Sequence, residues 1–256
     1  MIVVLSPAKT LDFESEPKHP AISDPPFPKL TAALAQTLRG YSAERLGDLM
    51  HINEQLADLN RQRFQTFEIP TEAEDARSAI DAFQGDVYRG LQAAKWTTKQ
   101  AAYAHDHLRI LSGLYGVLRP LDRILPYRLE MGTRLKTRRG KNLYEFWGSH
   151  LDREIADAIQ QSGSQYLLNL ASVEYFKVID PKSQDVPVLA PKFCELRKGK
   201  PVSITVFNKM ARGSMASWVI RKKVRSESKL RDFAEDGYAY SEEHSQPGKP
   251  MFLRSE

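Results

Sequence analysis

The feature that most constrains this chain is its set of short apolar runs, each ended by polar or helix-breaking residues. None of them approaches the roughly 18 residues that a membrane-spanning helix needs. The N-terminal run from Met1 to Leu5 is cut by Ser6-Pro7, and it lacks the basic lead and long apolar stretch of a signal peptide. The chain must therefore bury many short elements against one another, and we expect a cytoplasmic protein that does not enter the membrane.

The order of these runs predicts a mixed α/β fold in one compact domain over residues 1–256. Strands are expected at 2–5, 166–170, 186–189 and 202–207, with a closing strand pair within 238–253. Helical spacing covers 30–40, 46–64, 76–85, 97–111, 143–161 and 209–224. Two capping signals support this pattern: a capping box at Thr71 and Glu74, and a cap at Thr97 or Thr98. A Pro-rich stretch at 18–29 lies too near the N-terminus to separate two domains.

Charge is distributed unevenly along the chain. Residues 1–100 hold 11 Lys and Arg against 14 Asp and Glu, whereas residues 101–256 hold 26 against 18. A polarised field of this kind favours an anionic partner on one side of the molecule, because the summed charge steers association. The other interpretation is a merely solvated basic surface.

Four segments could carry the binding of phosphate. Lys9 and Thr10 follow the first strand, at the end of a strand where α/β proteins build their sites, although a surface lysine paired with Asp12 is an equal alternative. The glycines of a nucleotide-triphosphatase loop are absent there. Lys209 and Arg212 lie three residues apart on one predicted helical face.

The run from Leu108 to Pro120 has the outline of a helix-hairpin-helix. Gly113 and Gly116 would form the hairpin, with Tyr115 between them and Arg119 just after it. In such a module, backbone N–H groups at the start of the second helix bind DNA phosphates without distinguishing bases. Two residues separate the glycines instead of one, so a helix end followed by an ordinary loop is the alternative interpretation.

A basic belt extends from Arg119 to Lys141. It contains Arg119, Arg123, Arg128, Arg134, Lys136, Arg138, Arg139 and Lys141, against only Asp122 and Glu130. Guanidinium groups suit phosphate, and this density favours a binding function over a simply soluble loop.

Signals for catalysis and for metal are weak. His105 and His107 are two residues apart, so on a helix they point in different directions, and the other histidines have no ligand spacing. Asp12 and Glu174 lie where strand ends are expected, and either could act as a general acid or base. We expect no metal and no cofactor, and the sequence identifies no protein partner.

Several ordered strings resemble the YaaA family, bacterial proteins linked to peroxide stress. They cover residues 5–12, 83–88, 111–122, 126–132, 169–172, 174–176 and 211–213. The resemblance implies an unusual α/β fold with a helix-hairpin-helix-like element and a positively charged cleft. It also implies binding of duplex DNA, including distorted or bubble-containing duplexes, and a role in limiting iron-linked oxidative damage.

The leading hypothesis is therefore a DNA-binding protein that contacts phosphates without sequence preference. The contacts expected are Lys9, Thr10, Gly113, Tyr115, Gly116, Arg119, Arg128, Lys209 and Arg212. The alternative is an enzyme of unassigned reaction acting on a nucleotide or modified base in the same cleft.

Overall fold

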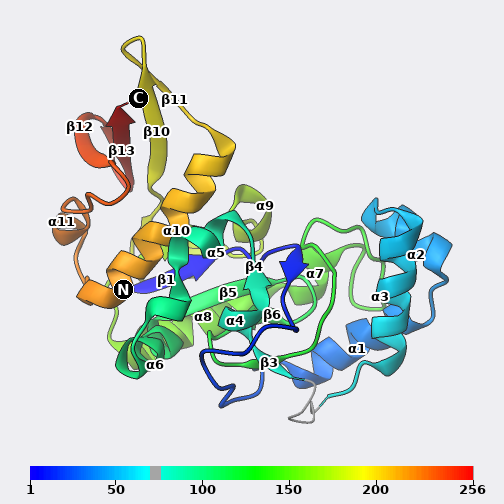
Figure 1. Cartoon of the computed structure of the whole chain (residues 1–256). Helices are drawn as coiled ribbons and strands as arrows, with labels where there is room; N and C mark the ends of the chain where they lie inside the picture. The colour runs from blue at the N-terminus through cyan, green and yellow to red at the C-terminus, as the bar shows by residue number, and fades with distance from the viewer. Residues whose placement is uncertain (70–75, 256) are drawn as a thin grey trace.

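The computed structural model describes residues 1–69 and 76–255, and its centre is a five-stranded main sheet (Figure 1). The strand order is β6-β5-β1-β8-β9, in which β6 alone is antiparallel to its neighbour. The strands are β1 (Ile2–Leu5), β5 (Leu108–Ser112), β6 (Gly116–Leu118), β8 (Leu167–Asn169) and β9 (Val188–Leu189). Together with the surrounding helices, this sheet confirms the predicted mixed α/β class.

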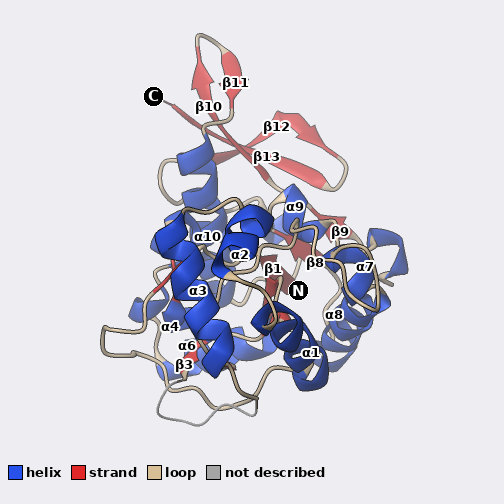
Figure 2. Ribbon diagram, turned by 90° about the vertical axis from the view of Figure 1, so that its right-hand side faces the viewer, coloured by secondary structure: helices blue, strands red, loops and turns tan. Residues whose placement is uncertain are grey.

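The central strand β1 is buried along its whole length. Val3 lies opposite Leu108 of β5 on one side and Leu168 of β8 on the other. Figures 1 and 2 show β1 between α8 (Ser149–Ser162) and α10 (Thr205–Lys222), both of which contact it. A parallel strand covered on both faces has no need of polar alternation, which explains its uninterrupted apolar sequence.

The order of connections gives this sheet a switch point. From β1 the chain passes to β5 on one side, and it later returns to β8 and β9 on the other side of β1. In open α/β sheets, ligands bind outside the carboxyl ends of the strands where the direction of winding reverses. Here that place lies between β1 and β8.

Three helices form a group at the right of Figure 1, far from the N-terminus. They are α1 (Pro28–Arg39), α2 (Ala43–Met50) and α3 (Glu54–Thr66). Leu34 and Leu38 of α1 are fully buried and α1 ends at Gly40, as the four-residue spacing predicts. Ser42 and Asn53 cap α2 and α3 by accepting backbone N–H groups.

The other helices and short elements surround the main sheet. The helices are α4 (Ala79–Ala82), α5 (Asp86–Leu91), η2 (Ala93–Lys95), α6 (Thr98–His107), α7 (Leu143–Trp147), α9 (Val173–Phe176), η3 (Pro181–Ser183) and α11 (Glu227–Leu230). Two short antiparallel ribbons accompany them. In one, β2 (Thr10–Leu11) pairs with β4 (Phe83–Gln84), and in the other, β3 (Arg77–Ser78) pairs with β7 (Arg123–Ile124). Of the two predicted caps, Thr97 and Thr98, it is Thr97 that caps α6, and it forms a complete capping box with Gln100. None of the helices in the described ranges is both long and apolar enough to cross a membrane.

Helices α5 and α10 pack unusually closely. A Cβ atom on Gly213 would lie 1.8 Å from the Val87 carbonyl oxygen, and one on Gly90 would lie 2.0 Å from that of Met210. Only glycine permits this approach of two backbones.

A second, four-stranded sheet with order β11-β10-β13-β12 projects at the top of Figure 1. Its strands are β10 (Lys192–Arg197), β11 (Lys200–Val202), β12 (Ala239–Gln246) and β13 (Lys249–Ser255). Phe193 and Phe252 of this sheet stack at 5.7 Å, and both contact Phe233 edge-on. The strand pair predicted within 238–253 is confirmed as β12 and β13.

The helix-hairpin-helix prediction is wrong. The residues from Leu108 to Leu118 form strand β5, a tight turn and strand β6, with Ser112 opposite Gly116. Helix α6 ends at His107, so Leu108 and Leu111 belong to a strand and not to the helix predicted over 97–111. A strand buried on both faces and a buried helical turn give the same apolar spacing over so few residues.

Several other predicted elements have different limits. The helix expected over 46–64 is two helices, α2 and α3, and the one expected over 76–85 is divided into β3, α4 and β4. The helix expected over 143–161 is broken at Gly148, which has φ +46°, into α7 and α8. The strand expected at 202–207 ends at Val202, and α10 begins at Thr205. The capping box predicted at Thr71 and Glu74 lies outside the described residues.

Candidate functional site

Two loops meet at the carboxyl edge of the main sheet, one after β1 and the other after β8. The Ser6 hydroxyl accepts the backbone N–H of Ser172 at 2.8 Å and donates to the Ser172 hydroxyl at 3.3 Å. Tyr88 of α5 donates its phenol O–H to the Ser6 carbonyl at 3.1 Å. Arg212 of α10 donates to the Ala171 carbonyl at 2.8 Å. The switch point is thus held in a fixed shape from several elements.

A cavity of about 770 Å³ opens beside this edge, and we call it the sheet-edge cleft. Such a volume lies within the roughly 300–1,000 Å³ of typical ligand sites. Four separate segments supply its lining, which is Lys9, Asp48, Leu49, Met50, His51, Arg128, Glu130, Gly132, Thr133, Arg134 and Glu174. Residues far apart in sequence therefore meet at the place where the topology predicts a site.

Ionic groups of both signs face this cleft. Glu130 lies between two cations, since its carboxylate is 2.7 Å from Lys9 Nζ and 3.2 Å from Arg128 Nη2. Glu174 accepts the backbone N–H of Gly132 at 2.9 Å through Oε1, which orients the carboxylate. The cations can hold a phosphate, and the carboxylates can accept hydrogen bonds from a base or hydroxyl.

The basic belt divides into two halves. The paired half consists of Arg119, Arg123 and Arg128, each in an ion pair with a carboxylate at 2.9 to 3.2 Å. The free half consists of Arg134, Lys136, Arg138, Arg139 and Lys141. No carboxylate occurs in the sequence from 134 to 141, and none of these five forms an ion pair with any residue that the structure describes. The exposed positive charge therefore concentrates in the second half.

The free half is connected to the cleft and is partly fixed in place. Arg134 lines the sheet-edge cleft itself. Arg139 donates to Nε2 of His150 at 2.9 Å, and its guanidinium lies 5.8 Å from the centre of the Phe146 ring. Burial and then the neighbouring Arg139 lower the pKa of His150, which favours the neutral imidazole that this contact needs. The cleft and the free half form one continuous candidate interface.

The structure brings together three of the predicted site residues, Lys9, Arg128 and Glu174, at the sheet-edge cleft. Thr10 adjoins Lys9 as the first residue of β2, and it is exposed. Lys209 is exposed on α10. Arg212 lies on the same helix and lines a different cavity, described below.

Arg119 is separated from this group. Strand β6 begins opposite Ser112 at the carboxyl edge and runs antiparallel to β5, so Arg119 emerges at the amino edge. There it donates to the fully buried Asp122 from both its backbone N–H and its Nε. Its guanidinium stabilises a turn at the edge opposite Lys9.

Gly113, Tyr115 and Gly116 are buried, which corrects their predicted contact with phosphate. A Cβ on Gly113 would lie 2.3 Å from the Leu129 carbonyl, and Trp147 donates to the Gly113 carbonyl at 3.0 Å. The turn is tight because it packs against other backbone, and its N–H groups do not face solvent.

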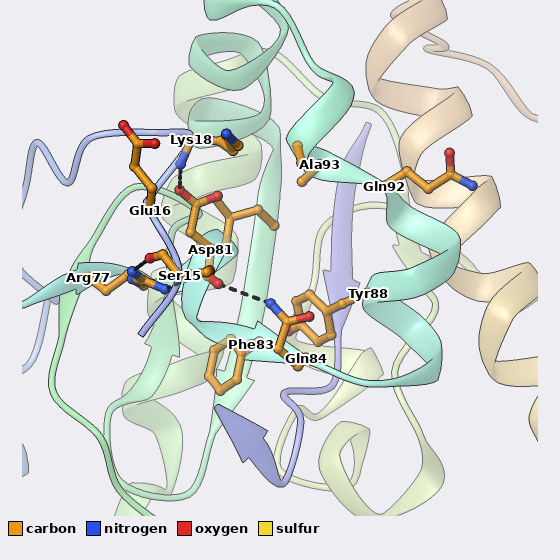
Figure 3. A pocket seen from close by; sticks show the side chains of 12 residues that line it. Ser15, Glu16, Lys18, Arg77, Asp81, Phe83, Gln84, Tyr88, Gln92 and Ala93 are labelled. Atoms are coloured by element: carbon orange, nitrogen blue, oxygen red, sulfur yellow. Dashed lines mark hydrogen bonds between the residues drawn. The ribbon is translucent and has the colours of Figure 1, made fainter. Parts of the chain in front are cut away.

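Asp12 has a structural role. It accepts the backbone N–H groups of Glu14 and Ser15 and pairs with the buried Arg77 at 3.3 Å. Hydrogen bonds from Ser15, first among several causes, lower the pKa of Asp12 to about 2, so it is a poor proton acceptor at neutral pH. Figure 3 shows the adjoining pocket of about 320 Å³, where Arg77 and Asp81 are likewise bound to the surrounding loop.

Sequence reasoning missed the contribution of Glu130, Asp48 and His51 to the site. Glu130 stands within the string of residues 126–132, two positions after Arg128, and alternation along an extended segment places both side chains on one side. The two-residue spacing of Arg128 and Glu130 could therefore have predicted that Glu130 belongs to the site. Asp48 and His51 reach the cleft only because α2 packs over it, which no local pattern shows.

Comparison with known proteins agrees with this architecture. Residues 1–244 match the model of the family described as peroxide stress protein YaaA. The chain belongs to this family. A UPF0246 protein of Shewanella baltica strain OS195 is 45% identical over 256 residues, covering 100% of both chains.

Two other relatives match over nearly their whole lengths. A UPF0246 protein of Pseudoalteromonas translucida is 44% identical over 257 residues, covering 100% of this chain and 99% of the relative. One from Ruegeria pomeroyi is 44% identical over 254 residues, covering 99% and 98%. The resemblance to the YaaA family in the ordered strings is confirmed.

Proposed function

We propose that this YaaA-family protein binds duplex DNA, including distorted and bubble-containing duplexes, largely without sequence preference. Its role in peroxide stress would follow from protecting DNA when intracellular iron promotes oxidative damage. The free half of the belt supplies the main phosphate contacts, and Lys9 extends them to the sheet edge once it leaves its ion pair with Glu130. Lys209 is a further expected contact.

The observation that carries this proposal is the unneutralised charge of the free half. Five exposed cations lie within eight residues with no carboxylate among them, and a duplex presents a dense row of negative charge, about one per 1.7 Å of axis, for such cations to neutralise. Arginine and lysine side chains that are already ion-paired would have to give up a partner before they bind phosphate, whereas these five would not.

Purified protein and a fluorescent duplex, with and without a central bubble, provide the test across a salt series. The double variant Arg138→Ala/Arg139→Ala should lower the affinity at least tenfold and reduce the slope of log affinity against log salt by roughly 1.8, or 0.9 per contact. Arg123→Ala is the matched control from the paired half, and its affinity should stay within twofold. A duplex affinity that does not change with salt concentration would contradict the proposal.

The sheet-edge cleft favours a second candidate, an enzyme acting on a nucleotide or modified base. A phosphate surface needs neither Glu130 nor Glu174, yet both carboxylates face the cleft and Glu174 is oriented by the Gly132 N–H. Glu174→Gln keeps an oxygen that can accept this hydrogen bond but removes the charge. A binding protein should keep its DNA affinity and its protection against peroxide, whereas an enzyme using Glu174 should lose protection while still binding.

A further inference from the structure

A second cavity lies between the two sheets, and neither the duplex-binding surface nor the sheet-edge cleft includes it. We call it the inter-sheet cavity, and its volume is about 800 Å³. It opens at the carboxyl ends of β8 and β9, where Asn169 and Ala190 line it. Figure 2 shows α9 beside these strand ends and below the four-stranded sheet. Like the sheet-edge cleft, the cavity lies outside the carboxyl ends of main-sheet strands, although it lies beside the switch point between β1 and β8 and not at it.

The cavity holds a partly buried cation, Arg212, that forms no ion pair with a residue in the described part of the chain. Arg212 donates to the Asn208 side chain at 2.9 Å and to the Ala171 carbonyl, both of which are neutral. No carboxylate of the described chain pairs with it, and burial lowers the pKa of its guanidinium. Arg109 is the contrasting case, because its buried guanidinium lies 3.7 Å from Glu154. Removing a charge from water is costly unless an opposite charge compensates it, so Arg212 provides a place for an anion.

Other cations converge on the same cavity. Lys192 and Lys249 are the first residues of β10 and β13, and Lys177 follows α9. None of the three forms an ion pair within residues 1–69 and 76–255; Lys177 lies 5.1 Å from the centre of the Tyr144 ring instead. Four cations against the two carboxylates of Asp152 and Asp180 leave the lining with an excess of positive charge, which suits an anionic ligand.

The rest of the lining is suited to a flat organic body with polar edges. Val173, which is 85% exposed, and Phe176 provide an apolar wall. Asp152 and Asp180, from α8 and the loop after α9, can accept hydrogen bonds from hydroxyl or amino groups. In its described contacts Asn169 uses only its side-chain oxygen, toward the Ala171 N–H, so its amide NH₂ is available as a donor.

We propose that the inter-sheet cavity binds a mononucleotide. The phosphate would lie against Arg212, with Lys192 and Lys249 completing its neutralisation. The base would lie on the wall formed by Val173 and Phe176, and the carboxylates of Asp152 and Asp180 would accept hydrogen bonds from the ribose hydroxyls. This inference is independent of duplex binding, because it rests on none of the residues of the free half.

Isothermal titration calorimetry of the full chain with AMP, GMP, CMP and UMP tests the inference directly. At least one of the four should bind with a dissociation constant below 1 mM, and the matching nucleoside should bind at least tenfold more weakly because it lacks the phosphate. Inorganic phosphate alone should bind more weakly than the nucleotide. Failure of all four nucleotides at millimolar concentration overturns the inference, as does a nucleoside that binds as well as its nucleotide.

Variants locate the binding and separate the two functions. Lys192→Glu and Lys249→Glu lie on exposed strand ends, and together they should weaken nucleotide binding at least tenfold. Lys222→Glu, exposed at the end of α10, makes the same change of charge per residue away from the cavity and should have no effect. Arg138→Ala/Arg139→Ala should bind nucleotide normally, so a failure of duplex binding and a failure of this inference are distinguishable. Nucleotide binding that survives in Lys192→Glu/Lys249→Glu would place the ligand elsewhere and overturn the assignment.

Discussion

The two halves of the basic belt have the same kinds of side chains but different surroundings. In the paired half every guanidinium has a carboxylate within 3.2 Å, and Arg119 even contacts a fully buried one. The free half, from Arg134 to Lys141, has no acidic residue in sequence and no ion pair in the described structure. A count of basic residues therefore overstates the field that a DNA phosphate would meet, because three of the eight belt cations are engaged in holding the fold. The following predictions test this division, beginning with the largest expected effect.

Removing the buried carboxylate of the paired half should destabilise the protein. Asp122 accepts the backbone N–H of Arg119 at 2.7 Å, its Nε at 3.0 Å, and the Ser23 hydroxyl at 2.6 Å. Asp122→Ala should lower the free energy of unfolding by about 3–5 kcal/mol, because it leaves these donors and a cation without their partner. Denaturant unfolding followed by circular dichroism measures this. A loss below about 1 kcal/mol would mean that the paired half does not stabilise the fold.

Releasing the cations at the boundary between the halves should strengthen binding. Glu130→Gln removes the charge that engages Lys9 and Arg128 while keeping the shape of the side chain. Duplex affinity should rise several-fold, about 1 kcal/mol, and depend more steeply on salt, because more cations can then neutralise phosphates. Fluorescence anisotropy against a salt series measures both quantities. An unchanged affinity would place the sheet-edge cleft outside the DNA interface.

Acid should weaken the paired half through His105. The imidazole accepts the Leu121 N–H at 3.4 Å through Nδ1, and burial, followed by the nearby Arg119, lowers its pKa in the folded protein. The unfolded state therefore binds more protons as the pH falls through about 6.5, and stability that is present above this pH is lost below it. Unfolding free energies between pH 7.5 and 5 should decline in the native protein.

The decline should be shallower in His105→Gln. It should not vanish, because burial also lowers the pKa values of His107 and His150. An identical pH dependence in the variant and the native protein would contradict this role of His105.

The smallest effect is expected at Asp24, the exposed partner of Arg123. Their ion pair measures 3.0 Å, and 54% of the Asp24 side chain is exposed. Asp24→Ala should change the unfolding free energy by less than about 1 kcal/mol, as is usual for surface pairs. Duplex affinity should stay within twofold, although the substitution frees a cation, because Arg123 does not line the sheet-edge cleft and pairs with Ser78 of β3 instead. A clear gain in affinity would extend the DNA interface into the paired half and break the comparison.

Local sequence signals predicted several elements well. The four-residue spacing of Leu34 and Leu38, the stop at Gly40 and the cap at Thr97 each depend on residues within one or two turns, and all are confirmed. The strand from Ile2 to Leu5 was equally clear because a purely apolar run beside Ser6-Pro7 cannot be a surface helix. Such signals depend on interactions between residues that are close in sequence, so the amino-acid sequence alone is enough to predict them.

The largest errors occurred where the decisive contacts are distant in sequence. Leu108 and Leu111 form part of a strand because β1 pairs beside them, and Gly113 is a glycine because Leu129 backbone lies against it. Neither contact can be predicted from the sequence of residues 108–118 alone. The helix-hairpin-helix outline therefore looked plausible from the spacing of two glycines, although both are buried.

The sequence by itself determined the α/β class, the family and the presence of a basic segment, because composition and short-range order suffice for these. Only the tertiary structure decided which cations are available, since Asp24 lies about a hundred residues before Arg123 and Lys9 a similar distance before Glu130. It also decided that Arg119 and Lys9 emerge at opposite edges of the main sheet and that Arg212 forms no ion pair with any carboxylate of residues 1–69 and 76–255. Electrostatic partners are chosen in space, and the fold sets the distances that make a charge paired or free.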